Sequence, residues 1–208
     1  MTKPFIFSAD AHLAEPPELY RQNMPAHLQD WALWTDADEK SVIIMMGDKQ
    51  ILKVYRNFHD HKTGELGCED VRRLGGRNLD MRLKDMERDG VDAELCYPGV
   101  GLTAGLITDA EALKHTCRIY NDWAWDYLDG LHDKLIAAAM LPHIDIDDTV
   151  AELERVIAKG YRTVMLPSVL PPNAPLYNDP VWDRVFSICG EHGIPICIHT
   201  SSGYKDIR

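Results

Sequence analysis

Apolar segments of strand length alternate with amphipathic helical patterns along most of this chain, and this order constrains the fold more than any other feature. The segments expected to form strands are 5–12, 91–97, 135–141, 161–166 and 194–199. Such a succession predicts a parallel sheet whose crossover connections are right-handed. Both an open doubly wound sheet and a (β/α) barrel satisfy it, so the fold class is α/β.

Capping signals mark the helices between these strands. Thr108 and Glu111 have the spacing of a capping box before a long helix. Asp147 and Asp148 are the candidate caps of the next helix, and Gly160 is the expected stop at its end. The sequence therefore separates helices from strands with little ambiguity in its second half.

Two details favour the barrel over the open sheet. Three expected strands end in proline, at Pro98, Pro142 and Pro167, with polar or special residues just beyond. In TIM barrels the chemistry collects at these carboxyl ends of the strands. The segment Gly99-Val100-Gly101 lacks the third glycine and the immediate helix start of a dinucleotide-binding fingerprint. We therefore expect one barrel-type domain over residues 1–208.

A long insertion, residues 17–79, separates the first strand from its helix. Within it, segments 41–46 and 51–55 flank Gly47-Asp48 and are typical of a β-hairpin. Long insertions after a barrel strand lie on the face that carries the chemistry. The insertion is therefore expected to act as a lid or an oligomer contact.

Composition narrows the partners and the compartment. The net charge of −11 argues against nucleic acid, whose phosphates attract basic surfaces. Five scattered cysteines without a Cys-x-x-Cys pair favour reduced thiols over a disulfide framework. The chain lacks both a secretory signal pattern and an apolar run of the ~18 residues that span a bilayer. A cytoplasmic protein without a membrane contact is expected.

Acid and histidine side chains end the first expected strand, and a histidine ends the last. Asp10 and His12 are two residues apart, so on a strand they point to the same face. His199 closes the last strand. Metal ligands must converge from rigid elements, which the ends of barrel strands provide. Asp10, His12 and His199 are therefore the candidate metal ligands.

Other histidines compete for this role. His59 and His61 form a His-x-His motif, but the polar residues around them favour a solvated loop. His143 follows the third expected strand and is a candidate for the pocket wall. The alternative for His143 is an ordinary loop position.

Several segments together resemble the amidohydrolase-related family (amidohydrolase family 2) of metal-dependent TIM barrels, and within it proteins like aminocarboxymuconate-semialdehyde decarboxylase. The matching segments are 8–12 with Glu15-Pro16, 82–86, 89–92, Tyr97-Pro98, 120–123 and 194–199. The resemblance implies a (β/α)8 barrel, often a homodimer, with one divalent metal ion. Zn²⁺ is the first choice and Mn²⁺ the alternative, because the ligands combine oxygen and nitrogen.

The resemblance also implies roles and an activity. His12 and His199 become candidate catalytic residues, and Glu15, Tyr97 and His143 become candidate substrate contacts. An acid at Asp10 favours non-oxidative decarboxylation of a small carboxylated aromatic or unsaturated acid. Metal-dependent hydrolysis of a C–O or C–N bond is the alternative, since the same kind of site supports it.

The barrel is incomplete within these residues. Eight strands typically take ~250 residues, whereas this chain supplies five strands in 208. The family's remaining site residues, a histidine after the sixth strand and an aspartate after the eighth, have no counterpart here. We expect a piece of a longer protein, a shortened homologue completed by oligomerisation, or a non-catalytic barrel remnant that serves as a binding or assembly partner.

Overall fold

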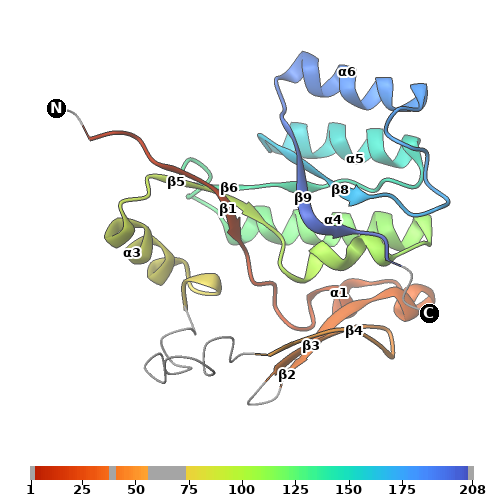
Figure 1. Cartoon of the computed structure of the whole chain (residues 1–208), viewed down its shortest axis with the longest axis horizontal. Helices are drawn as coiled ribbons and strands as arrows, with labels where there is room; N and C mark the ends of the chain where they lie inside the picture. Colours follow the sequence, from red (N-terminus) through yellow and green to blue (C-terminus); the bar gives the residue numbers. More distant parts are fainter. Residues whose placement is uncertain (1–2, 38–40, 56–73, 206–208) are drawn as a thin grey trace.

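Parallel strands form the centre of the molecule in chain order, as the computed structural model shows for residues 3–37, 41–55 and 74–205 (Figure 1). The first sheet contains β1 (Phe7–His12), β5 (Ala93–Tyr97) and β6 (Leu135–Ala137). The second contains β7 (Ala139–Met140), β8 (Val164–Val169) and β9 (Ile196–Gly203). All four neighbour pairs within these two sheets are parallel. The predicted α/β order is therefore confirmed.

Ala138 joins the two sheets, because β6 and β7 are one strand interrupted at this residue. The Ala138 N–H donates to the Cys96 carbonyl at 2.9 Å, on the β5 side. The Ala139 N–H donates to the Thr163 carbonyl at 3.1 Å, next to β8. The layer thus runs without a break from β1 to β9. Among the described residues no strand pairs with the outer edge of β1 or of β9, so a closed barrel is not seen.

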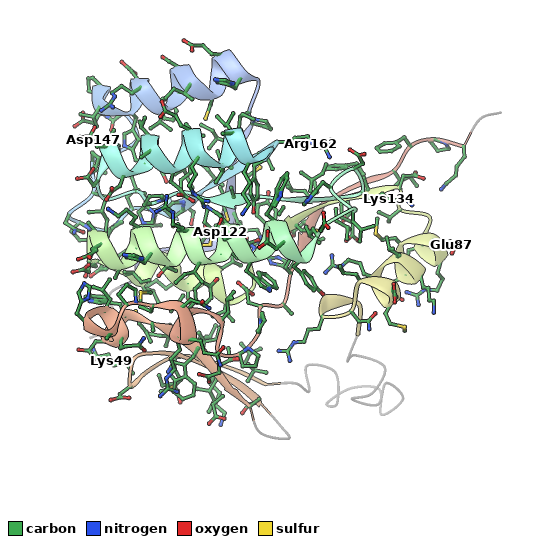
Figure 2. The ribbon with its side chains drawn as sticks, turned by 180° about the vertical axis from the view of Figure 1, so that it is seen from behind. Lys49, Glu87, Asp122, Lys134, Asp147 and Arg162 are labelled. Carbon is green, nitrogen blue, oxygen red and sulfur yellow. The ribbon has the colours of Figure 1, made fainter. Side chains whose placement is uncertain are left out.

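Helices fill the crossovers between the strands. They are α3 (Leu79–Asp89), α4 (Ala110–Tyr127), α5 (Ile146–Lys159) and α6 (Asp183–His192), and short 3-10 turns η3 (Val100–Leu106) and η4 (Pro180–Trp182) precede α4 and α6. Seen from behind, α4, α5 and α6 follow one another across one face of the molecule (Figure 2). Asp122 on α4 accepts hydrogen bonds from Arg155 at 2.7 Å and Lys159 at 2.8 Å, which ties α4 to α5.

Two of the expected caps are wrong by one to three residues. Asp109, not Thr108, caps α4 by accepting from the Ala112 N–H. Asp145, not Asp147 or Asp148, caps α5. In both cases the residue with extended backbone just before the helix takes the capping position, where its side chain reaches the free N–H groups of the first turn.

The insertion forms a small antiparallel sheet after α1 (Leu19–Asn23) and η1 (Ala26–Trp31). The expected hairpin is present as β3 (Ser41–Met46) and β4 (Lys49–Tyr55). A further strand, β2 (Leu33–Ala37), pairs with β3 and was not expected from the sequence. The chain resumes at η2 (Leu74–Gly76), before α3.

The core lies between the parallel strands and their helices. Its largest fully buried side chains include Tyr20, Tyr120, Leu135, Leu153 and Trp182. The two outer strands carry apolar side chains that are less buried than the core: Phe7 on β1 is 46% exposed and Ile198 on β9 is 58% exposed. Among the helices of the described residues, none combines the length and apolar character of a membrane span.

Candidate metal centre

Strand β1 carries Asp10 and His12 towards the carboxyl edge of the sheet. Its register with β5 shifts between Ser8 and Ala11, where β1 has one residue more than its partner. Bulges of this kind re-aim side chains and often lie beside functional sites. Asp10 lies within this irregularity, and its side chain is 76% exposed. The bulge therefore presents the carboxylate to solvent beside the sheet edge.

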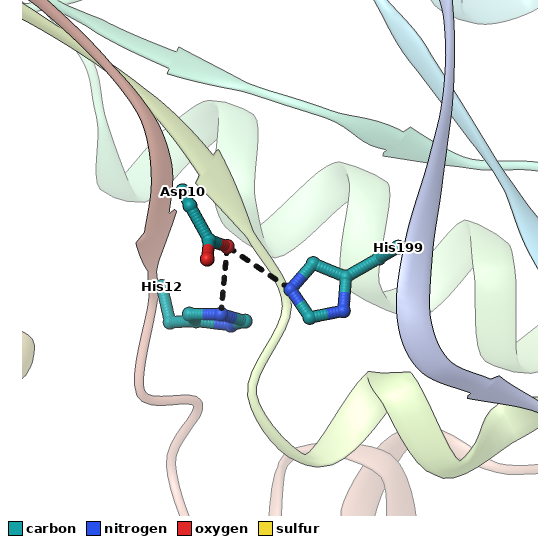
Figure 3. A group of neighbouring side chains, drawn as sticks. All are labelled: Asp10, His12 and His199. Atoms are coloured by element: carbon teal, nitrogen blue, oxygen red, sulfur yellow. Dashed lines mark hydrogen bonds and ion pairs between the residues drawn. The ribbon is translucent and has the colours of Figure 1, made fainter.

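Strand β9 brings His199 to the same place. His199 lies in the middle of β9, which continues to Gly203, so the expected strand end at His199 is wrong. Its Nε2 atom is 3.1 Å from Oδ1 of Asp10, and Nε2 of His12 is 3.5 Å from the same oxygen (Figure 3). One ligand atom from each of the three side chains lies within 4.8 Å of the others. The three predicted residues are therefore brought together.

Backbone carbonyl groups fix the orientation of both imidazole rings. Nδ1 of His12 lies 2.9 Å from the Pro98 oxygen, and Nδ1 of His199 contacts the Thr200 oxygen. A carbonyl oxygen only accepts hydrogen bonds, so each Nδ1 must carry the hydrogen. In its neutral form, each ring then turns the lone pair of Nε2 towards Asp10.

With both rings neutral, three acceptor atoms face one another without a hydrogen between them. Either a bound cation or protonation of the rings relieves this arrangement. Ligand atoms about 2.1 Å from a tetrahedral zinc ion are about 3.4 Å apart, close to the two separations measured from Oδ1 of Asp10. One carboxylate oxygen with two imidazole nitrogens is also a donor set that suits Zn²⁺ and Mn²⁺. The cluster could therefore hold one divalent ion.

Arg82 supports the site from α3, although sequence reasoning did not include it among the site residues. It is 8% exposed, and its guanidinium donates to the His12 carbonyl oxygen and to Glu94 at 2.6 Å. The helical periodicity of the sequence could have indicated that Arg82 is buried. Arg82 occupies the inward face of α3 with Leu79 and Met86, where a charged residue needs a buried partner.

Tyr97 lies beside the cluster. Its ring centroid is 4.7 Å from that of His199 and 6.0 Å from that of His12. Burial and the hydrogen bond to the Cys197 thiol raise the Tyr97 pKa well above its ordinary value. Tyr97 is therefore a neutral aromatic wall of the site, and a contact with substrate stays a prediction.

Glu15 and His143 are not members of the Asp10, His12 and His199 cluster. Glu15 is 2% exposed, and backbone N–H groups and a tyrosine hydroxyl surround its carboxylate. Both carboxylate oxygens accept hydrogen bonds within the protein, and a substrate contact at Glu15 stays a prediction. His143 is buried beside a small cavity that Gly101 and Ser202 also line. His59 and His61 lie outside the described residues.

Comparison with known proteins gives a family and a set of similar folds. A family model described as amidohydrolase matches residues 9–208. No curated protein matches the chain in sequence. An amidohydrolase from Mycobacterium avium subsp. paratuberculosis K-10 superposes with a TM-score of 0.76 at 17% identity, covering 98% of this chain and 60% of that one.

Two solved decarboxylases superpose as well. A 2,6-dihydroxybenzoate decarboxylase from Rhizobium has a TM-score of 0.61 at 18% identity, covering 95% of this chain and 50% of its own. A dihydroxybenzoic acid decarboxylase from Polaromonas sp. JS666, solved with manganese and 2-nitroresorcinol, has a TM-score of 0.61 at 14% identity, covering 95% and 49%. The chain thus spans about half to three fifths of the length of these structures.

Proposed function

The chain belongs to the amidohydrolase family, and on this premise we propose that it serves the metal-dependent, non-oxidative decarboxylation of a small carboxylated aromatic or unsaturated acid. The observation that carries the proposal is the convergence of Asp10, His12 and His199. The side chains of these three residues come from two strands that are far apart in the sequence, and they face one another at an accessible sheet edge. A divalent cation is the group that this arrangement fits best.

Asp10, His12 and His199 would hold the ion, with the two histidines as the groups closest to the reaction. The chemistry that such an ion supplies when bound is Lewis acidity towards oxygen atoms of the substrate. Pro98 and Thr200 keep the histidine rings oriented through their carbonyl groups. Zn²⁺ remains our first choice and Mn²⁺ the alternative.

Because the chain is acidic, binding of a negatively charged substrate at this site requires a bound cation. The net charge is −11, and Asp10 adds a carboxylate at the site itself. A substrate carboxylate would be repelled there unless a divalent ion reversed the local charge. The aromatic wall of Tyr97 beside His199 fits an aromatic or unsaturated carbon skeleton. Two decarboxylases of similar fold, whose names give dihydroxybenzoates as substrates, support this substrate class.

Several wider features belong to the same proposal. We place the five parallel strands in a (β/α)8 barrel, to which they would contribute consecutive strands. Residues 17–79 would form a lid or an oligomer contact over the site. We further propose a cytoplasmic homodimer.

Release of carbon dioxide tests the proposal. The protein is loaded with Mn²⁺ or Zn²⁺ and supplied with a panel of carboxylated phenols, and the phenol product and carbon dioxide are measured. We expect turnover that is lost in Asp10→Ala and kept in Glu111→Gln, which changes an exposed acid paired with His27. Cleavage of ester or amide substrates without carbon dioxide release would favour the hydrolase instead. Stoichiometric metal without any turnover would favour a non-catalytic binding or assembly role.

A further inference from the structure

The Glu15 carboxylate is enclosed by consecutive backbone N–H groups at the start of η3. Oε2 accepts from Gly99 and Val100 at 3.0 Å each, and Oε1 accepts from Gly101 at 2.9 Å. The Tyr20 hydroxyl donates to Oε1 at 3.0 Å. Successive N–H groups in such a concave arrangement form an anion-binding nest. The anion in this nest is a side chain of the protein itself.

The two glycines of this segment are required by the close approach of their surroundings. A Cβ on Gly99 would lie 2.8 Å from the Leu13 oxygen and 2.9 Å from Oε2 of Glu15. A Cβ on Gly101 would lie 2.7 Å from the Tyr20 hydroxyl. The Gly99-Val100-Gly101 motif, which does not fit a nucleotide site, is therefore explained by the close packing of its backbone against this carboxylate and the residues around it.

The enclosed segment is joined directly to His12. Pro98 precedes Gly99, and its carbonyl oxygen is the group that fixes Nδ1 of His12. Glu15 follows His12 by three residues, and between them the Leu13 N–H donates to the Tyr97 oxygen at 2.8 Å. The two strand ends of β1 and β5 are thus clamped together at three points. A displacement of η3 would move the Pro98 carbonyl away from the His12 ring.

We propose that Glu15 is a positioning residue for His12: by anchoring residues 99–101, it holds the Pro98 carbonyl where that group keeps the hydrogen on Nδ1 and directs Nε2 towards Asp10. Glu15 acts through the backbone and touches neither Asp10 nor His199. The expected effect of Glu15 on metal binding rests on the proposed metal site. The first readout, the tautomer of His12, needs no metal.

Glu15→Gln tests the proposal in the full chain. Glutamine keeps the size but replaces one acceptor oxygen by a donor NH₂ group, which opposes the surrounding N–H groups. Glu152→Gln is the matched control, because Glu152 is also buried and accepts hydrogen bonds, from Asn121 and Arg155, between α4 and α5. Both variants lose a buried carboxylate, but only one of them is connected to His12.

The first measurement is the ¹H–¹⁵N spectrum of the histidine side chains in the metal-free protein at about pH 9, where ordinary imidazole rings are neutral, with His12 assigned by the signals lost in His12→Asn. We expect a single tautomer with hydrogen on Nδ1 in the unmodified protein and in Glu152→Gln. In Glu15→Gln we expect His12 to populate both tautomers. The second measurement is a calorimetric titration with Mn²⁺, where Glu15→Gln should bind at least tenfold more weakly, as for other partners that orient a metal-bound histidine.

The outcomes separate this inference from the proposed function. If His12 keeps one tautomer and Mn²⁺ affinity is unchanged in Glu15→Gln, the positioning role is overturned and Glu15 only stabilises the fold. If the tautomer changes but even the unmodified protein binds no metal, the metal proposal fails and the positioning role holds. Should Glu15→Gln not fold, Gly99→Ala displaces the same segment and is expected to give the same mixture of His12 tautomers. A single Nδ1–H tautomer in Gly99→Ala would then overturn the inference.

Discussion

Asp10 and His199 are 189 positions apart in the sequence, yet Oδ1 of the one lies 3.1 Å from Nε2 of the other. They belong to the first and last of the five parallel strands among the described residues, which lie in chain order. Their side chains meet between β1 and β9, as Figure 3 shows. The proximity is a property of the whole layer, so changes that loosen a strand end should disturb the site.

Replacing Arg82 by methionine should cost much of the stability of the chain. The change leaves Glu94 without its partner and removes a donor to the His12 carbonyl. Breaking a buried ion pair from one side typically lowers the free energy of unfolding by about 3–5 kcal/mol. Arg88→Met is the control, since Arg88 lies on the same helix but is exposed, and its loss should be much smaller. Urea unfolding measures both, and equal losses would contradict the support assigned to Arg82.

Adding a methyl group at Gly101 should destabilise the protein. Its Cβ would lie 2.7 Å from the Tyr20 hydroxyl and 2.9 Å from the Met140 sulfur. Overpacking of this kind costs roughly 1–3 kcal/mol of unfolding free energy. Gly190→Ala, within α6 and with open space around it, should instead stabilise by roughly 0.5–1 kcal/mol. Thermal unfolding of the two variants should therefore shift in opposite directions.

His143 should make stability depend on pH in mildly acidic solution. Burial lowers its pKa from 6.5 to about 4. Between these values the unfolded chain binds a proton that the native chain does not, so the free energy of unfolding rises with pH. The stability lost from above pH 6.5 to below pH 4 is about 3 kcal/mol.

His143→Leu should remove this contribution and flatten the curve over that range. Urea midpoints at several pH values, compared with the unmodified protein, give the measurement. Parallel curves for the two proteins would show that His143 does not carry the dependence.

The order of strands and the pairing of distant site residues followed from the sequence. Apolar runs that alternate with capped helices determine a parallel layer, and strand ends of such a layer share one edge. Asp10, His12 and His199 could therefore be placed near one another before their distances were known. Their role as ligands stays a prediction.

Features that depend on backbone contacts could not be predicted in the same way. The Glu15 carboxylate meets N–H groups 84 to 86 residues away, and backbone donors leave no side-chain pattern to read. Strand β2, with the sequence Leu-Trp-Thr-Asp-Ala, does not alternate apolar and polar residues, and its partner is β3. The α5 cap was ambiguous because Asp145, Asp147 and Asp148 are all good caps, and only the backbone angles select Asp145.

The central claim is that Asp10, His12 and His199 form one metal site, and titration of the metal-stripped chain with Mn²⁺ or Zn²⁺ tests it most directly. We expect one ion per chain, with affinity at least tenfold lower in Asp10→Ala and in His199→Ala. His27→Ala, which changes an exposed histidine paired with Glu111, should bind like the unmodified protein. If Asp10→Ala and His199→Ala bind as tightly as the unmodified protein, or if that protein binds no ion, the claim is contradicted.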